Sequence, residues 1–106
     1  MTIRTSRHGT GWTVEAAFIQ ENGLIILAPA DTKVTALAYV DLWAEICPTH
    51  HEPGDYRIEA VYAGNQFTHA DDLLKDDLRS AAIAILKGDE QWCAWAHEEA
   101  IGRRAA

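Results

Sequence analysis

The stretch from Asp31 to Cys47, DTKVTALAYVDLWAEIC, decides the fold that we predict for this chain. At about 100° per residue, Lys33, Asp41 and Glu45 fall within one narrow stripe of a helix. Apolar side chains occupy most of the remaining circumference: Leu37, Val40, Leu42, Trp43, Ala44 and Ile46. A helix that is apolar nearly all round is buried on several sides. We therefore predict a central helix here, packed inside a small domain or shared with a partner.

A β-hairpin is predicted before this helix. Residues 12–18 alternate between apolar and polar side chains, and residues 24–28 form a second apolar run. Between them, Asn22-Gly23 tolerates the positive φ angles of a type I′ turn. A two-residue turn pairs Phe18 with Leu27, facing the interior, and Ile19 with Ile26, which needs a cover on the reverse side.

Two further strands and two helices are predicted after Pro48. Residues 56–62 alternate, with one face formed by Tyr56, Ile58, Ala60 and Tyr62. Gly64-Asn65 indicates a turn into a short strand at Gln66 and Phe67. Thr68 and Asp71 have the spacing of a capping box for a helix that ends at Lys87, with Gly88 in the left-handed terminating position. Asp89 caps a third helix that Gly102 ends.

These elements predict a small α+β domain with the order β-β-α-β-β-α-α over residues 12–106. Its mostly antiparallel sheet packs against the central apolar helix, and two helices follow at the C-terminus. Residues 1–11 are expected to form a flexible segment or an edge strand. At 106 residues, with 48% apolar and 24% charged residues, the composition is that of a folded protein.

Charge and chain segments restrict the partners and the compartment. The net charge of −7 disfavours direct binding of nucleic acid, which needs clustered cations, and it favours a protein partner with a basic surface. No apolar stretch approaches the roughly 18 residues of a membrane span, so no membrane association is expected. The polar start and the two cysteines indicate free thiols and a cytoplasmic location.

Candidate chemical sites are few. Cys47 and His50 on one segment, with Cys93 and His97 on another, could supply the four ligands of a zinc site. Because Cys93 falls inside a helix, we interpret these residues as packed thiols and surface histidines. We predict no metal, no other cofactor and no catalytic residues. The alternative is a small ligand-binding or metal-dependent enzyme that uses the His50-His51 loop together with Asp41 and Glu45.

The side chains that we predict at a protein interface lie in the C-terminal third: Trp92, Trp95, Asp71, Asp72 and Asp76. Paired tryptophans often anchor interfaces, and the carboxylates would steer a basic partner. The chain also has more apolar side chains than one thin layer can cover, which favours a homodimer. We therefore predict a non-enzymatic protein-interaction module, comparable in size and charge to inhibitors, immunity proteins and phage or mobile-element accessory proteins. A structural assembly subunit is a second alternative.

Overall fold

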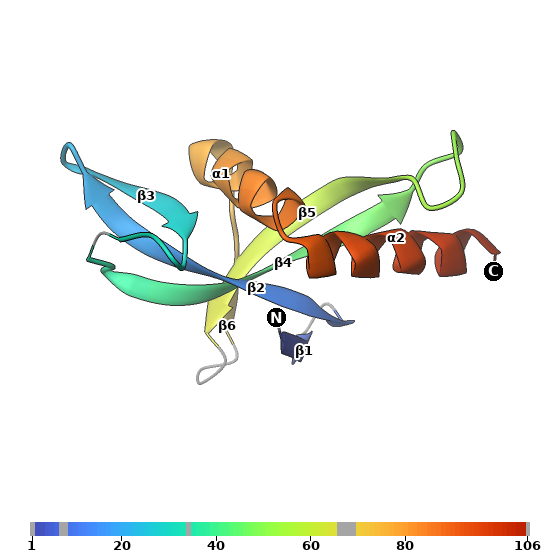
Figure 1. The fold of residues 1–106 in the computed structure, drawn as a ribbon, viewed down its shortest axis with the longest axis horizontal. Coiled ribbons are helices and arrows are strands. Elements are labelled where there is room, and N and C mark those ends of the chain that lie inside the picture. The colour runs from blue at the N-terminus through green and yellow to red at the C-terminus, as the bar shows by residue number, and fades with distance from the viewer. Residues whose placement is uncertain (1, 7–8, 34, 66–69, 106) are drawn as a thin grey trace.

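The computed structural model describes residues 2–6, 9–33, 35–65 and 70–105, in which strands precede helices (Figure 1). Within those residues the strands are β1 (Thr2–Ser6), β2 (Gly9–Glu21), β3 (Leu24–Pro29), β4 (Ala38–Pro48), β5 (Tyr56–Asn65) and β6 (Ala70–Leu73). The helices α1 (Asp76–Lys87) and α2 (Glu90–Ala105) follow. The predicted α+β class and the two C-terminal helices are confirmed, whereas no described helix lies between strands.

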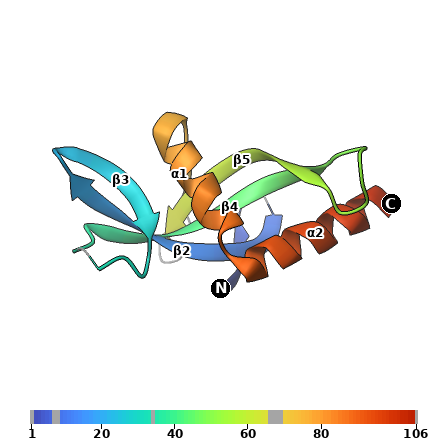
Figure 2. The same ribbon diagram turned by 45° about the horizontal axis from the view of Figure 1, so that its top comes forward.

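The described strands form one curled antiparallel sheet with the order β1-β2-β4-β5-β6. β3 lies off this path and pairs with β2. β2 is long enough to pair with β1 through residues 9–13 and with β3 through residues 16–21. Both helices lie on one side of the sheet (Figures 1 and 2). We call the side that faces the helices the inner face, and the opposite side the outer face.

The predicted central helix is wrong, because β4 runs through its second half in the middle of the sheet. Trp43 lies on the outer face of β4, where its ring stacks on Tyr62 with 4.4 Å between the ring centroids. A strand covered on both faces reads as a continuous apolar run, and periodicity alone does not separate it from a buried helix. Its inner-face side chains join the main core: Leu42, Ala44 and Ile46.

The predicted β2–β3 hairpin is confirmed. Asn22 and Gly23 form its turn with φ angles of 53° and 79°, as a type I′ turn requires. The observed register includes the two predicted pairs, Phe18 with Leu27 and Ile19 with Ile26. The expected cover for the outer side comes from the β3–β4 connection, where Ala36 packs against a small buried cluster of Ala17, Ile19 and Ala28.

A β-bulge in β5 changes the predicted face of that strand. Glu45 pairs with Ala60 and the next residue of β4, Ile46, pairs with Ile58, so Glu59 is an extra residue in β5. An extra residue reverses which face the following side chains occupy. The first half of the prediction holds, since Tyr56 and Ile58 pack against the main core. Beyond the bulge the prediction is wrong, because the core side chains are Val61 and Ala63 rather than Ala60 and Tyr62.

The second predicted helix begins later than expected. Asp71 lies in β6, where it pairs with Gly64, and α1 begins only at Asp76. Gly64 and Asn65 are therefore strand residues, and the predicted tight turn at this position is wrong. The short strand predicted at Gln66 and Phe67 and the cap predicted at Thr68 lie outside the described residues.

The start of α2 follows the prediction, whereas its end does not. The Asp89 Oδ1 atom accepts a hydrogen bond from the Trp92 backbone N–H at 2.8 Å, which caps the helix. The helix continues through Gly102 to Ala105, so Gly102 does not end it. Gly88, at the end of α1, has a φ of −82° and is not in the left-handed conformation that we predicted.

The main core lies between the inner face and the two helices. Val14 and Leu42 come from the sheet, Leu86 from α1, and Trp92 and Ala96 from α2; all of them are buried. The molecule is elongated, with principal extents of 46 × 27 × 22 Å. One end consists of the tip of the β2–β3 hairpin and the start of β4, far from α2 (Figures 1 and 2). In the described part of the chain, neither helix has the length and apolar character needed to cross a bilayer.

Candidate functional site

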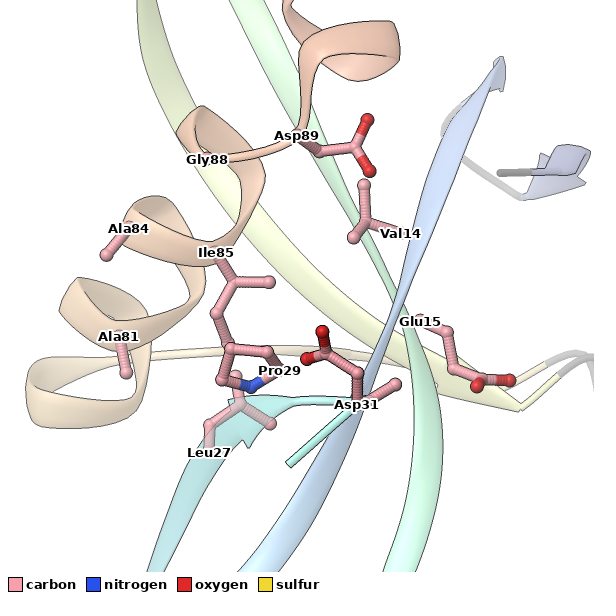
Figure 3. Close-up of a pocket in the computed structure, with 11 residues that line it drawn as sticks. Val14, Glu15, Leu27, Pro29, Asp31, Ala81, Ala84, Ile85, Gly88 and Asp89 are labelled. Carbon is pink, nitrogen blue, oxygen red and sulfur yellow. The ribbon is translucent and has the colours of Figure 1, made fainter. Parts of the chain in front are cut away.

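A groove of about 700 Å³ lies between α1 and the sheet, where the middle of β2 meets the end of β3 (Figure 3). Its sheet wall includes Val14 of β2 with Leu27 and Pro29 of β3. Its helix wall consists of small and aliphatic side chains of α1: Ala81, Ala84 and Ile85. Apolar walls and a volume of this size are typical of binding sites. We call this feature the α1–β3 groove.

Two carboxylates give the α1–β3 groove its charge. Asp31, just after β3, and Asp89, between the helices, both point toward the space around Val14 and Ile85 (Figure 3). Glu15 also contributes to the lining, but its carboxylate points away, because alternate residues of β2 face opposite sides of the sheet (Figure 3). None of the described residues that line the groove is Lys or Arg. The site therefore combines an apolar floor with negative charge.

A second, smaller groove of about 400 Å³ lies between the first half of β3 and the start of α1. Leu24 and Ile25 line it on the strand side, and Lys75, Asp76 and Asp77 line it on the helix side. Leu27 of β3 and Ala81 of α1 line both grooves. The two grooves therefore meet at these residues. The two grooves thus follow the same seam between strand and helix.

Large apolar side chains are exposed together at the hairpin end of the molecule. Their exposed fractions are 68% for Leu24, 59% for Ile25, 56% for Leu37 and 58% for Tyr39. Tyr39 pairs with Ala17 of β2, and Leu37, two residues earlier, donates its N–H to the Phe18 carbonyl at 2.7 Å. Leu24 and Ile25 therefore lie beyond one edge of β2, and Leu37 and Tyr39 lie beyond the other edge. We call these four residues the apolar end.

The two tryptophans predicted at an interface lie against the core of their own chain. Trp92 has no exposed surface, and its ring meets Tyr56 edge-on at 6.0 Å and Trp95 at 6.1 Å between centroids. Trp95 is half-buried and packs on the same core. The expected contact between the two indoles is present, whereas the burial of Trp92 leaves it no surface to offer to a partner.

The predicted acidic residues are divided between two elements. Asp71 and Asp72 lie in β6, and Asp76 is the first residue of α1, so they do not crowd one helix end as expected. Asp72 and Asp76 are exposed, and Asp76 lines the smaller groove. Asp76 also has a φ of 58°, a left-handed conformation that Asp adopts more readily than most residues.

The Cys and His residues considered for zinc do not form one site. Cys47 pairs with Arg57 on the outer face, since its neighbour Ile46 packs in the inner core. Cys93 lies on α2 at the inner side, where its thiol donates a hydrogen bond to the Lys87 carbonyl at 3.3 Å. The sheet therefore separates the two thiols. In the described ranges, no three His, Cys, Asp or Glu side chains gather closely enough to hold a metal ion.

Tyr56 and His97 connect α2 to the loop between β4 and β5. Burial raises the pKa of the Tyr56 hydroxyl above its ordinary value, and the adjacent Cys93 thiol raises it further. The imidazole of His97 lies directly over Gly54, which is buried and has a φ of +84°. The contact between His97 and Gly54 thus joins this loop to α2. His50 and His51 belong to the same loop and are exposed.

Alanine at Gly54 is expected to destabilise the fold through two separable effects. The positive φ strains any L residue by about 1–2 kcal/mol, and the new Cβ would overlap the His97 ring, which must leave its place. Gly23→Ala is the matched control, because Gly23 has a φ of +79° but nothing within 4 Å of an added Cβ. Urea denaturation should show a larger loss for Gly54→Ala, and His97→Ala should remove the difference. Equal losses in the wild-type background would contradict the contact.

Asp41 and Glu45, considered as an acid–base pair, are both on β4 and on its outer face. Four residues of an extended strand span about 13 Å, whereas one turn of a helix would have brought the two carboxylates together. Trp43 lies between them, and the Glu45 Oε1 atom is 3.5 Å from the Tyr62 hydroxyl. The change from helix to strand therefore separates the proposed pair.

Sequence reasoning did not find the α1–β3 groove. Asp31 and Asp89 are 58 positions apart, and no local pattern relates them. The sequence predicts Asp89 as a helix cap, but its second role in the wall of the groove depends on where α1 lies.

No family model, no curated protein and no solved structure matches the chain.

Proposed function

We propose that this protein is a non-enzymatic protein-interaction module that forms a homodimer through the apolar end. The observation that carries this proposal is the grouping of Leu24, Ile25, Leu37 and Tyr39, each more than half exposed, at one end of an elongated molecule. Isolated exposed apolar residues are ordinary, whereas several large ones at one end of a molecule favour a surface that binds another protein.

The strand register indicates how this surface is built. Leu24 pairs with Glu21, and Tyr39 pairs with Ala17, so both side chains lie on the outer face, whereas Ile25, the next residue of β3, points to the inner face. Neither α1 nor α2 lies on that face (Figures 1 and 2). Ile26 also reaches it and is only partly buried there. A second copy with the same apolar surface could bury these side chains around a two-fold axis, which is the commonest symmetry of homo-oligomers.

Light scattering on the purified protein tests this proposal. Wild type is expected to be a dimer, and Tyr39→Asp should weaken dimerisation by about 30-fold or more, the size of an aromatic hot spot. Ile101→Asp is the matched control, because Ile101 is 41% exposed on α2, at the other end of the molecule. Circular dichroism should show that both variants stay folded.

Two outcomes would overturn the dimer. One is a wild-type protein that stays monomeric at about millimolar concentration, where even weak pairing is detectable. The other is dissociation caused by Ile101→Asp and not by Tyr39→Asp. Growth into larger, concentration-dependent assemblies would instead favour the structural assembly subunit.

A further inference from the structure

We infer that the α1–β3 groove receives a Lys or Arg side chain from a basic, partly apolar segment of a second protein. This inference rests on the proposed function as an interaction module and names the chemistry of a partner other than a second copy. It depends on the shape of the groove, on the placement of two carboxylates within it, and on the lack of a described lining cation.

The groove matches the two parts of a long basic side chain. Lys and Arg bury their aliphatic stems on apolar surface and keep the charged group near water or a carboxylate. Pro29, Ala84 and Ile85, which line the groove and are exposed or half-buried, offer the apolar surface. Asp31 and Asp89 point toward the same space from two different connections, one after β3 and the other between the helices (Figure 3).

Only one of the two carboxylates has a structural task. Asp89 caps α2 through Oδ1, which leaves Oδ2 for another donor. Asp31 forms no hydrogen bond or ion pair within the described residues, and the neighbouring turn is closed by Thr32, whose hydroxyl donates to the Pro29 carbonyl at 2.6 Å. A cation between these two acids would relieve their mutual repulsion and complement a chain with a net charge of −7.

The charge continues along the seam between β3 and α1. Asp76 and Asp77 line the smaller groove with one cation, Lys75. A segment lying along this seam would thus meet apolar side chains of β3 and carboxylates in both grooves. Electrostatic complementarity of this kind selects a basic partner and speeds its association.

Nuclear magnetic resonance titration with a defined peptide tests the inference. The probe is acetyl-Leu-Arg-Leu-amide, and acetyl-Leu-Gln-Leu-amide is the uncharged control. The Arg peptide is expected to shift the backbone amides of residues 29–31 and 85–89 in a saturable manner. Asp31→Asn should weaken its binding by about fivefold, the upper range for an exposed ion pair. Glu98→Gln, which removes an exposed carboxylate of α2 outside both grooves, should leave binding unchanged.

Three results would overturn the inference: shifts spread over all acidic surfaces, equal binding of the Gln peptide, or no effect of Asp31→Asn. The titration is independent of the dimer test, because Asp31 is not part of the apolar end. A dimer that ignores the Arg peptide would remove this inference alone. A monomer that also ignores the peptide would remove the proposed function as well.

Discussion

Trp92→Ala is expected to lower the free energy of unfolding by about 3–5 kcal/mol, the range for removing a buried aromatic side chain. Trp92 has no exposed surface and contacts both Tyr56 and Trp95 in the main core. The cavity would open between α2 and the sheet. Urea denaturation followed by circular dichroism measures the loss.

Two further variants sharpen this prediction. Trp95→Ala should cost less, because Trp95 is half-buried. Trp92→Phe should also cost less, because the Trp92 indole Nε1–H is buried without a hydrogen-bond partner among the described residues, and an unsatisfied buried donor is itself unfavourable. A Trp92→Ala protein with normal stability and an altered oligomeric state would show that Trp92 belongs to an interface and not to the core.

Leu42→Ala is expected to lower the free energy of unfolding by about 2–5 kcal/mol, whereas Leu37→Ala should change it by less than about 0.5 kcal/mol. The two residues are the same type and only five positions apart. Leu42 is fully buried on the inner face of β4, and Leu37 is 56% exposed in the apolar end. The pair therefore compares a core position of β4 with an exposed position just before that strand.

Denaturation curves of both variants, measured below the concentration at which the protein dimerises, separate folding from association. Leu37→Ala should then affect the dimer and not the monomer. If both variants lose a similar, large amount of unfolding free energy, both leucines are buried. That result would favour the buried helix predicted from the sequence and would contradict the observed strand.

The hairpin was predictable because its information is local. Asn22-Gly23 selects one turn type, and a two-residue turn fixes every pair beyond it, including Phe18 with Leu27. The cap of α2 was predictable for the same reason, since Asp89 bonds a backbone N–H only three residues away. In both cases the residues that determine the structure lie close together in the sequence.

The errors arose where burial comes from distant parts of the chain. On β4, Trp43 stacks on Tyr62 on the outer face, while Leu42 faces the helices. Because both faces of this central strand are covered, its composition resembles that of a buried helix. The extra residue at Glu59 has no local signature, yet it reverses the faces of β5. The α1–β3 groove joins residues from both ends of the chain, and only the packed fold brings them together.

Both helices come after all of the described strands, which sets the order of events during synthesis. The strands are synthesised before the two helices that cover their inner face. Val14, Leu42 and Val61 are therefore expected to stay exposed to solvent until α1 and α2 have been synthesised. A nascent chain in that state exposes the kind of surface that chaperones bind and that promotes aggregation. We therefore expect folding to be completed only when α1 and α2 pack on the inner face, and chains stalled before that step to be recognised by cellular quality control.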